Sequence, residues 1–324
     1  MEENGKYTYN DYYNNSQDYV NYKNDNVNTT EEDAAFINIH GFYIFYLAVS
    51  ILIFLIGVPG NSLVIWITGL KMKKTVNTTW YLSLAVSDLI FCVTFSLFHI
   101  ILIVTGGSIL GVFMFNFTIA LIFITMFSSI FLLVIISVDR YVWVVFPVWA
   151  QNNRTIDMAS IVVILAWVSS VALTTRYMFV GEKDMEKIIL SQFIGGFAVP
   201  FLIIFFCYCV TILRLRTRQM MNVSSKSLRV MTVLITMFFI CWLPLHVFML
   251  LDQYHIYSSP EVIIPGLLVA IMLATVPSFL RPVLYVCMGN NVPPTLKRSI
   301  VGRIENVLGE EDPPTTSHET STHL

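Results

Sequence analysis

Long apolar stretches alternate with short polar connections along the chain. Five charge-free runs are each about one bilayer crossing long, because a spanning helix needs about 20 predominantly apolar residues. These runs cover residues 41–70, 158–175, 188–213, 230–251 and 262–280. Between residues 75 and 138 the only charge is Asp88, and the turn-forming segment 105–108 divides this stretch into two further crossings. The pattern predicts an all-α integral membrane protein, a bundle of seven transmembrane helices.

The composition supports the same environment. Apolar residues make up 56% of the 324 residues and charged residues 12%, against about 25% charged residues in soluble domains. Lipid offers no partner to backbone N–H and C=O groups, so a chain of this kind spans the bilayer as helices. The formal net charge of −2 says little about partners. We expect the lipid bilayer as a partner, but no nucleic acid.

The 19 Lys and Arg residues are unevenly distributed over the connections. Counting odd-numbered connections as cytoplasmic places most of them inside the cell and leaves Arg281 within the membrane. Under the positive-inside rule this distribution predicts an extracellular amino terminus. Residues 1–35 have no basic start followed by an apolar core, so the first helix is expected to act as the insertion signal. The residues predicted to lie outside are Lys6, Lys23, Arg176, Lys183 and Lys187.

Charge and hydropathy divide the chain into three regions. Residues 1–35 are acidic and rich in tyrosine, and their low hydrophobicity is typical of a disordered extracellular arm. Residues 41–288 hold the seven crossings, and residues 289–324 form the predicted cytoplasmic tail. From Glu305 onward the tail combines acids with Ser and Thr, so we expect it to be disordered and open to phosphorylation.

Glycosylation sequons occur on both predicted sides of the membrane. Asn14 and Asn28 lie in the extracellular arm and are the two predicted glycosylation sites. The sequons at Asn77 and Asn153 fall in predicted cytoplasmic loops, where glycosylation is not expected.

Cysteine usage and catalytic motifs argue against an enzyme. All five cysteines lie inside apolar runs, so no disulfide framework is expected on the outer face, and each is read as a small buried residue. The chain has no metal-binding His or Cys spacing and no glycine-rich phosphate loop. We therefore expect no catalytic site, no metal and no cofactor. The cysteines are Cys92, Cys207, Cys209, Cys241 and Cys287.

Ionisable groups within the membrane are functional candidates, because each costs about 2.5–3.5 kcal/mol at the centre of a helix on insertion scales. Asp88 lies in the middle of the second crossing, Arg281 near the middle of the seventh, and Asp139 with Arg140 at the cytoplasmic end of the third. We predict that Asp88 and Arg281 pair in the bundle interior. The alternative is an Arg281 that reaches the inner interface without a partner.

Several motifs resemble those of rhodopsin-class G-protein-coupled receptors, in the same order and with the same spacing over all seven crossings. The segments 71–77 and 146–155, together with the acidic arm, narrow the resemblance to the chemoattractant branch. That branch holds the formyl-peptide, complement-anaphylatoxin and chemerin receptors, and the chemerin and formyl-peptide receptors are the most similar. The motif residues are Gly60, Asn61, 84–88, Asp139, Arg140, Tyr141, Trp167, Pro200, Tyr208 and 241–244.

The resemblance implies a receptor for a peptide or small secreted protein, coupled to an inhibitory-class G protein, with arrestin as a further partner. The ligand would bind in an outer cavity above Trp242, and Arg140 would meet the G protein. Candidate ligand-binding residues are His99, Arg176, Gln192, Trp242, His246 and Asp252. Candidate residues for activation and G-protein coupling are Asp139, Arg140, Tyr141, Tyr208 and Tyr285.

The chain also departs from the family pattern. Phe115 replaces the cysteine at the top of the third helix, and the loop between the fourth and fifth helices is only about residues 181–187. Arg281 replaces an asparagine that, in relatives, helps the aspartate matching Asp88 and a polar residue matching Ser129 to surround a sodium ion. Residues 291–294 contain two prolines, which should interrupt the short amphipathic helix that relatives have there.

These departures leave a second interpretation open, an atypical receptor that binds ligand without normal G-protein coupling. A transporter or light-driven pump is a remote third. No repeated half supports a transporter, and no lysine lies in the seventh crossing to hold a retinal.

Overall fold

The computed structural model describes residues 44–104, 111–178, 185–217, 221–254, 260–288 and 299–309. Within these ranges the regular elements are all helices, and no strand occurs. By its contacts the chain divides into two units, Met1–Phe45 and Tyr46–Leu324, and the helices α3 to α12 belong to the second. The predicted acidic arm, with Asn14 and Asn28, lies outside the described residues.

The predicted number of crossings is confirmed. Among the described residues, seven helices are long and apolar enough to span a bilayer. They extend over Ile44–Lys71, Val76–Phe98, Ile119–Val145, Ile156–Arg176, Glu186–Thr217, Arg229–Gln253 and Val262–Met288.

Two of the seven spans are interrupted by π-helical turns, in which the backbone bonds run from residue i to i+5. The first contains η1 (Ile53–Gly57), α3 (Val58–Trp66) and η2 (Ile67–Lys71), and the fifth contains α8 (Met185–Phe193), η4 (Ile194–Ala198) and α9 (Val199–Thr217). The other spans lie in α4 (Val76–Val104), α5 (Gly111–Val145), α7 (Ile156–Met178), α10 (Met221–Gln253) and α11 (Pro260–Met288). Two short helices, α6 (Pro147–Asn153) and α12 (Ile300–Leu308), lie outside the spans.

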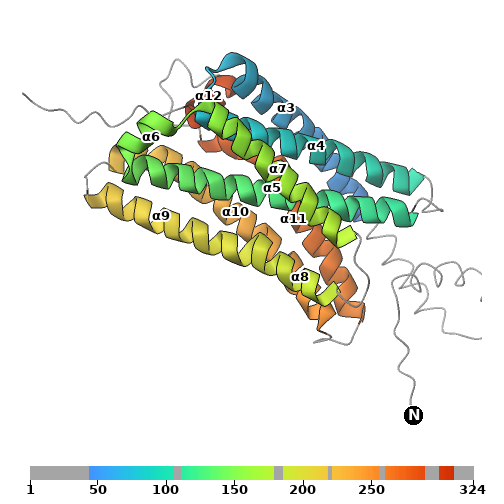
Figure 1. The fold of residues 1–324 in the computed structure, drawn as a ribbon. Coiled ribbons are helices and arrows are strands. Elements are labelled where there is room, and N and C mark those ends of the chain that lie inside the picture. Colours follow the sequence, from blue (N-terminus) through green and yellow to red (C-terminus); the bar gives the residue numbers. More distant parts are fainter. Residues whose placement is uncertain are drawn as a thin grey trace, which may run out of the picture. The chain divides into compact units, whose positions relative to one another are not determined.

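Helix α5 packs against α4, α7 and α9, and α10 packs along α11 (Figure 1). The first span joins α11 through a close contact, since a Cβ added at Gly60 would lie 2.9 Å from Pro282 Cβ. Beside it, Asn61 Nδ2 donates to the carbonyl oxygens of Gly57 and Ser278, at 2.9 Å each. Any larger residue at position 60 would therefore push α3 away from α11.

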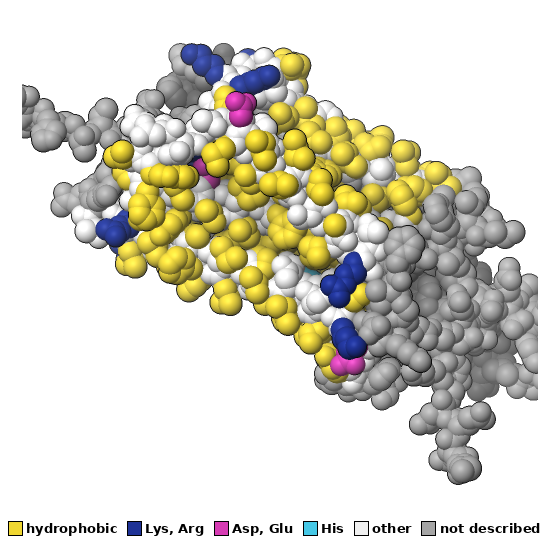
Figure 2. All heavy atoms as spheres, in the orientation of Figure 1, with side chains coloured by type: hydrophobic (Ala, Val, Ile, Leu, Met, Phe, Trp, Pro, Cys, Tyr) yellow, Lys and Arg dark blue, Asp and Glu magenta, His cyan; other side chains and the backbone are white. Residues whose placement is uncertain are grey.

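Apolar side chains fill the interior and also cover the flank of the bundle. Phe95, Phe127 and Phe238 are fully buried, whereas Ile164 and Val168 on α7 are each 60% exposed. Figure 2 shows hydrophobic side chains over the flank, with Lys and Arg side chains towards its ends. An exposed apolar band between charged ends is what a helix bundle presents to lipid.

Three details differ from the expectations. The segment Met185 to Lys187, predicted as a loop, is the first turn of α8. The expected disorder from Glu305 onward is wrong for residues 305–308, which end α12, and Val307 and Leu308 are buried there. Cys287 is exposed, although all five cysteines are free as predicted.

Helix α12 is the short amphipathic helix that the two prolines were expected to interrupt. Residues 289–298 lie outside the described residues, and the helix begins beyond them at Ile300. Ile304 and Leu308 bury its apolar side, while Glu305 forms a 2.9 Å ion pair with Lys71 at the end of η2. The short helix therefore exists, displaced past the prolines.

Candidate functional site

Asp88 and Arg281 meet in the interior of the bundle. Arg281 Nη1, from α11, lies 2.6 Å from both carboxylate oxygens of Asp88, from α4. The two residues are 0% and 1% exposed. Burying two charges is costly, and their mutual attraction offsets that cost only when the geometry is close, as it is here. The structure thus brings together the two groups that the sequence predicted to pair.

Tyr285 lies one helical turn beyond Arg281 on α11. Its ring packs edge-to-face against Tyr81, with centroids 5.9 Å apart. The Tyr285 hydroxyl and the Arg281 Nε are buried without a hydrogen-bond partner among the described residues. Capacity for a further hydrogen bond therefore remains beside the ion pair.

Arg140 lies at the end of the bundle that also carries Lys71, Arg154 and Arg214, which we call the basic end. Arg140 Nη2 donates to Asn77 Oδ1, and Arg154 Nη2 donates to the same oxygen at 2.6 Å. Arg154 also holds Asp139, through Nε–Oδ1 and Nη2–Oδ2 contacts of 2.8 and 3.1 Å. One amide oxygen and one carboxylate therefore fix two arginines across α4, α5 and the end of α6.

Sequence reasoning missed half of this network. Asn77 was placed in a loop, but it lies in the first turn of α4 and is 2% exposed. Arg154 was counted only as a loop charge, although it follows α6 directly and reaches back to Asp139. Asp139 pairs with Arg154 and not with its neighbour Arg140.

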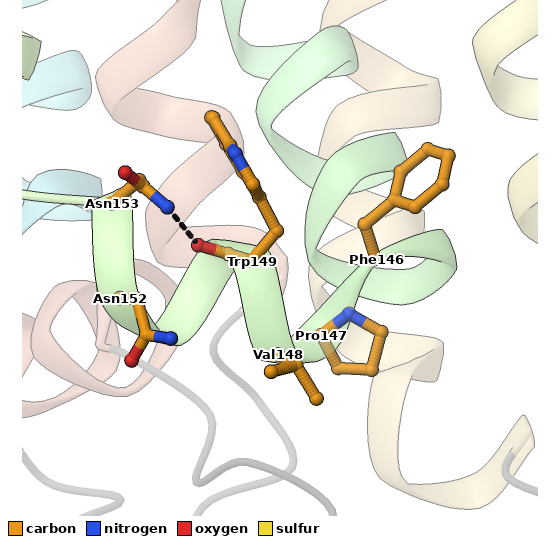
Figure 3. Close-up of a pocket in the computed structure, with 6 residues that line it drawn as sticks. All are labelled: Phe146, Pro147, Val148, Trp149, Asn152 and Asn153. Atoms are coloured by element: carbon orange, nitrogen blue, oxygen red, sulfur yellow. Dashed lines mark hydrogen bonds between the residues drawn. The ribbon is translucent and has the colours of Figure 1, made fainter.

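Helix α6 presents an apolar surface beside this network. It begins at Pro147, which suits the first helical turn because the missing N–H has no partner there. Phe146, Val148 and Trp149 are 52%, 72% and 53% exposed. An open hollow of about 510 Å³ lies here, and Figure 3 shows the Phe146 and Trp149 rings on one side of α6 and Val148 on the other. The hollow is lined by Phe146, Pro147, Val148, Trp149, Asn152 and Asn153.

Two tyrosines of the predicted activation set lie near the same end. The Tyr208 hydroxyl on α9 is 2.5 Å from the Thr232 hydroxyl on α10, so it joins the two helices. The ring of Tyr141 lies between those of Phe146 and Phe206, with centroid distances of 6.1 and 6.2 Å.

Two candidate ligand-binding residues are buried towards the opposite end. Gln192 on α8 is 6% exposed, and His246 on α10 is 3% exposed. Neither amide atom of Gln192 has a hydrogen-bond partner in the described part of the chain, and the same holds for His246 Nε2. The His246 ring contacts Phe193 and Phe197, at centroid distances of 5.8 and 5.1 Å.

A continuous series of aromatic contacts leads from His246 to Trp242. Phe197 packs edge-to-face on Phe239 at 5.0 Å, Phe239 contacts Phe238 at 5.4 Å, and Phe238 stacks on Trp242 at 5.8 Å. Trp242 itself is 3% exposed. Because protein interiors are densely packed, a displacement of the His246 ring would shift the rings that follow it in this series.

Two other candidate ligand-binding residues are not brought into this interior. Arg176 at the end of α7 and Asp252 at the end of α10 are both exposed. His99 lies in α4, and its side chain is outside the described residues. In the part of the chain that the structure describes, no group of three or more His, Cys, Asp or Glu residues could hold a metal ion.

The chain is similar to known proteins of one family. The family model described as "7 transmembrane receptor (rhodopsin family)" matches residues 60–285. The chain is 36% identical to the C3a anaphylatoxin chemotactic receptor of Danio rerio, over 82% of this chain and 78% of the relative. It is 33% identical to formyl peptide receptor-related sequence 4 of Mus musculus, over 83% and 92%. It is 31% identical to chemerin-like receptor 1 of Sus scrofa, over 83% of both chains.

Proposed function

Because the chain belongs to the rhodopsin family of seven-transmembrane receptors, within its chemoattractant branch, we propose that it binds a peptide or small secreted protein and activates an inhibitory-class G protein. It is a multi-pass plasma membrane protein, and its relatives are receptors rather than enzymes. The excess of Lys and Arg assigns the basic end to the cytoplasm and the opposite end to the extracellular side.

The series of aromatic contacts from His246 to Trp242 is the observation that carries this proposal. It begins at buried polar groups near the opposite end and leads into the core of the bundle. A ligand that binds one packing arrangement of these rings more tightly than another would shift the receptor between two global states. The differential affinity sets the size of that shift.

At the basic end, the buried Arg140 and the exposed apolar surface of α6 suit a protein partner. Arg140 is held by Asn77 in this arrangement, so a change in helix packing would release its guanidinium. Phe146, Val148 and Trp149 offer the apolar contact area that protein interfaces use at their centre. A heterotrimeric G protein is the proposed partner here, and arrestin is proposed to use the same end.

The test is to express the chain in cells and apply C3a, C5a, chemerin and formylated peptides, ligand classes suggested by the names of the relatives. Binding, suppression of cyclic AMP and arrestin recruitment are recorded together. Binding with cyclic-AMP suppression supports the proposal. Arg140→Ala serves as the control and should retain binding but lose nucleotide exchange. If none of these ligand classes binds, the proposal fails.

An atypical receptor, which binds ligand without normal G-protein coupling, is the second candidate. The observation that favours it is the ion pair between Asp88 and Arg281, which joins α4 to α11 through two buried charges. Such a link resists relative movement of the two helices. Ligand binding without cyclic-AMP suppression or arrestin recruitment would select this candidate.

A further inference from the structure

Gln192 is buried, and its side chain has no hydrogen-bond partner among the described residues. Other buried side chains, such as Ser50, Trp80 and Tyr285, leave a single atom unpartnered among the described residues, but Gln192 leaves both its donor and its acceptor. Native proteins satisfy the large majority of buried polar atoms. An amide that is 6% exposed and has no partner in the described part of the chain therefore has hydrogen-bonding capacity left for a ligand or for water.

His246 adds a second unpartnered group across the adjoining helix. Helices α8 and α10 are in contact, and Phe193, which follows Gln192 in the chain, contacts the His246 ring. His246 Nε2 has no hydrogen-bond partner within the described ranges, and the residue is 3% exposed. Two polar groups without partners among the described residues therefore lie on two helices that are in contact, and Phe193 links α8 to the His246 ring.

On the side that faces the core of the bundle, closely packed side chains close off the surroundings of Gln192. One turn beyond Gln192, a Cβ added at Gly196 would lie 2.8 Å from Phe127 Cε1 and 3.0 Å from Met126 Cε on α5. On the α10 side, Phe197 and Phe239 stack edge-to-face. A group that reaches Gln192 from the end of the bundle would stop here, between apolar walls.

In the described part of the chain, no buried cation lies beside Gln192 and His246 to receive an anion. Among the described residues, the buried cations are Arg140 and Arg281, which are bonded to Asn77 and Asp88. Arg176, at the nearer end of α7, and Lys187, on α8 itself, are both exposed. A carboxylate entering here would lose its hydration without gaining a charged partner, which is strongly unfavourable.

A neutral group fits the same surroundings. The Gln192 amide offers two N–H donors and a carbonyl acceptor, and His246 Nε2 can donate or accept, depending on its tautomer. A carboxamide or a hydroxyl could satisfy these atoms without any charge to compensate.

We propose that Gln192 and His246 form a buried site that binds an uncharged polar group at the inserted end of the ligand, and that the site discriminates against a carboxylate. The inference rests on the proposed receptor function and names the chemistry that its ligand brings to this site. Specificity arises because the wrong end group leaves buried polar atoms unpaired or a charge desolvated.

The first test needs no ligand. In purified receptor in lipid nanodiscs, Gln192→Met replaces the unpartnered amide by an apolar side chain of similar length. We expect the melting temperature to rise by about 2 °C or more. The matched control is Asn61→Leu, which removes a buried amide with two hydrogen bonds and should lower the melting temperature. A decrease for Gln192→Met like that of the control would overturn the inference.

The second test uses a library of synthetic peptides made in pairs. The two members of a pair differ at one group only, which is a carboxylate in one and a carboxamide in the other, either at the carboxyl terminus or on one side chain. Among peptides that bind, the carboxamide member should bind about tenfold or more tighter. The ratio should approach one in Gln192→Met and invert in Gln192→Arg, which supplies the missing cation. His246→Phe should reduce the ratio without inverting it.

The outcomes separate this inference from the proposed function. Equal or tighter binding of carboxylates to the unmodified receptor overturns the preference for a neutral group, whether or not the receptor signals. If no peptide of either form binds, the peptide-receptor function fails. A raised melting temperature of Gln192→Met would then still support the unpartnered site.

Discussion

The two ends of the bundle differ in how their buried polar groups are bonded. From Asp88 to the basic end, the buried charges are joined: Asp88 to Arg281, and Arg140 through Asn77 to Arg154. Towards the opposite end, the amide of Gln192 and Nε2 of His246 are buried without a partner among the described residues. The first arrangement stabilises one packing of the helices through bonds between its charged groups, although Arg140 Nε, Arg281 Nε and the Tyr285 hydroxyl have no partner among the described residues. In the second, neither the donor nor the acceptor of the Gln192 amide has such a partner. On the proposal made above, the first region fixes a conformation and the second binds the ligand.

The largest expected effect comes from breaking the buried ion pair. Asp88→Asn or Arg281→Asn alone should lower the free energy of unfolding by about 3–5 kcal/mol, because the remaining charge stays buried without its partner. The double change to two asparagines should recover part of the loss. Melting temperature and surface expression measure both effects, with the exposed Asp157→Asn as the control. Additive losses in the double variant would contradict the pairing.

Asn77→Ala probes the network at the basic end. It leaves Arg140 and Arg154 without the shared amide oxygen, and hydrogen bonds to charged groups contribute about 1.5–3 kcal/mol. We expect a destabilisation of that size in thermal unfolding. The exposed Asn152 of α6 provides the matched control, since Asn152→Ala should change stability by about 0.5 kcal/mol or less. Equal melting temperatures for the two variants would show that the network does not restrain Arg140.

At the opposite end the same kind of substitution should have the reverse sign. His246→Phe keeps the ring contacts with Phe193 and Phe197 and removes the unpartnered Nε2. Removing an unsatisfied buried group should stabilise the ligand-free protein by about 1 kcal/mol. Thermal unfolding in nanodiscs measures it. A loss of stability would mean that both ends are equally satisfied, and the contrast between them would disappear.

The contact between Tyr208 and Thr232 should have a smaller effect. Tyr208→Phe and Thr232→Val each remove one hydroxyl of the 2.5 Å contact between α9 and α10. Each change should cost about 0.5–1.5 kcal/mol. A double-mutant cycle on melting temperature should show coupling, because the two residues are in direct contact. Purely additive effects would show that the two hydroxyl groups do not interact.

The last prediction is that sodium has no effect on the stability of the unmodified protein. Replacing potassium by sodium at constant ionic strength should leave the melting temperature of the unmodified protein unchanged, since Arg281 already neutralises Asp88. In Arg281→Asn, Asp88 loses that cation, and sodium should raise the melting temperature. A sodium-specific shift in the unmodified protein would contradict this.

The sequence predicts the spans and the ion pair for the same physical reason. Apolar runs about one bilayer long leave few alternatives, and two opposite charges inside them are far more stable together than apart. Asn77 was misplaced because polar residues near a helix end resemble a loop. Helix α12 had a signal that could have been used, since Val301, Ile304 and Leu308 repeat at helical spacing.

The unpartnered state of Gln192 had no such signal. Hydropathy identifies the fifth span but does not reveal η4, and the π-helical turn decides which residues before it face the interior. Which buried atoms lack partners depends on the final packing of α5, α8 and α10. The sequence could identify Gln192 as a candidate, but only the structure shows which of its atoms are hydrogen-bonded.

The π-helical turn η4 places the two halves of the fifth span out of phase with each other. A π turn holds one residue more than an α turn would, and one residue corresponds to a rotation of about 100°. Deleting a single residue from η4 would turn α8 about its own axis relative to α9, exchanging buried Gln192 for a neighbour such as the exposed Ser191. Receptors built on this plan could therefore acquire a different recognition surface through the insertion or loss of one codon, with no substitution elsewhere in the fifth span.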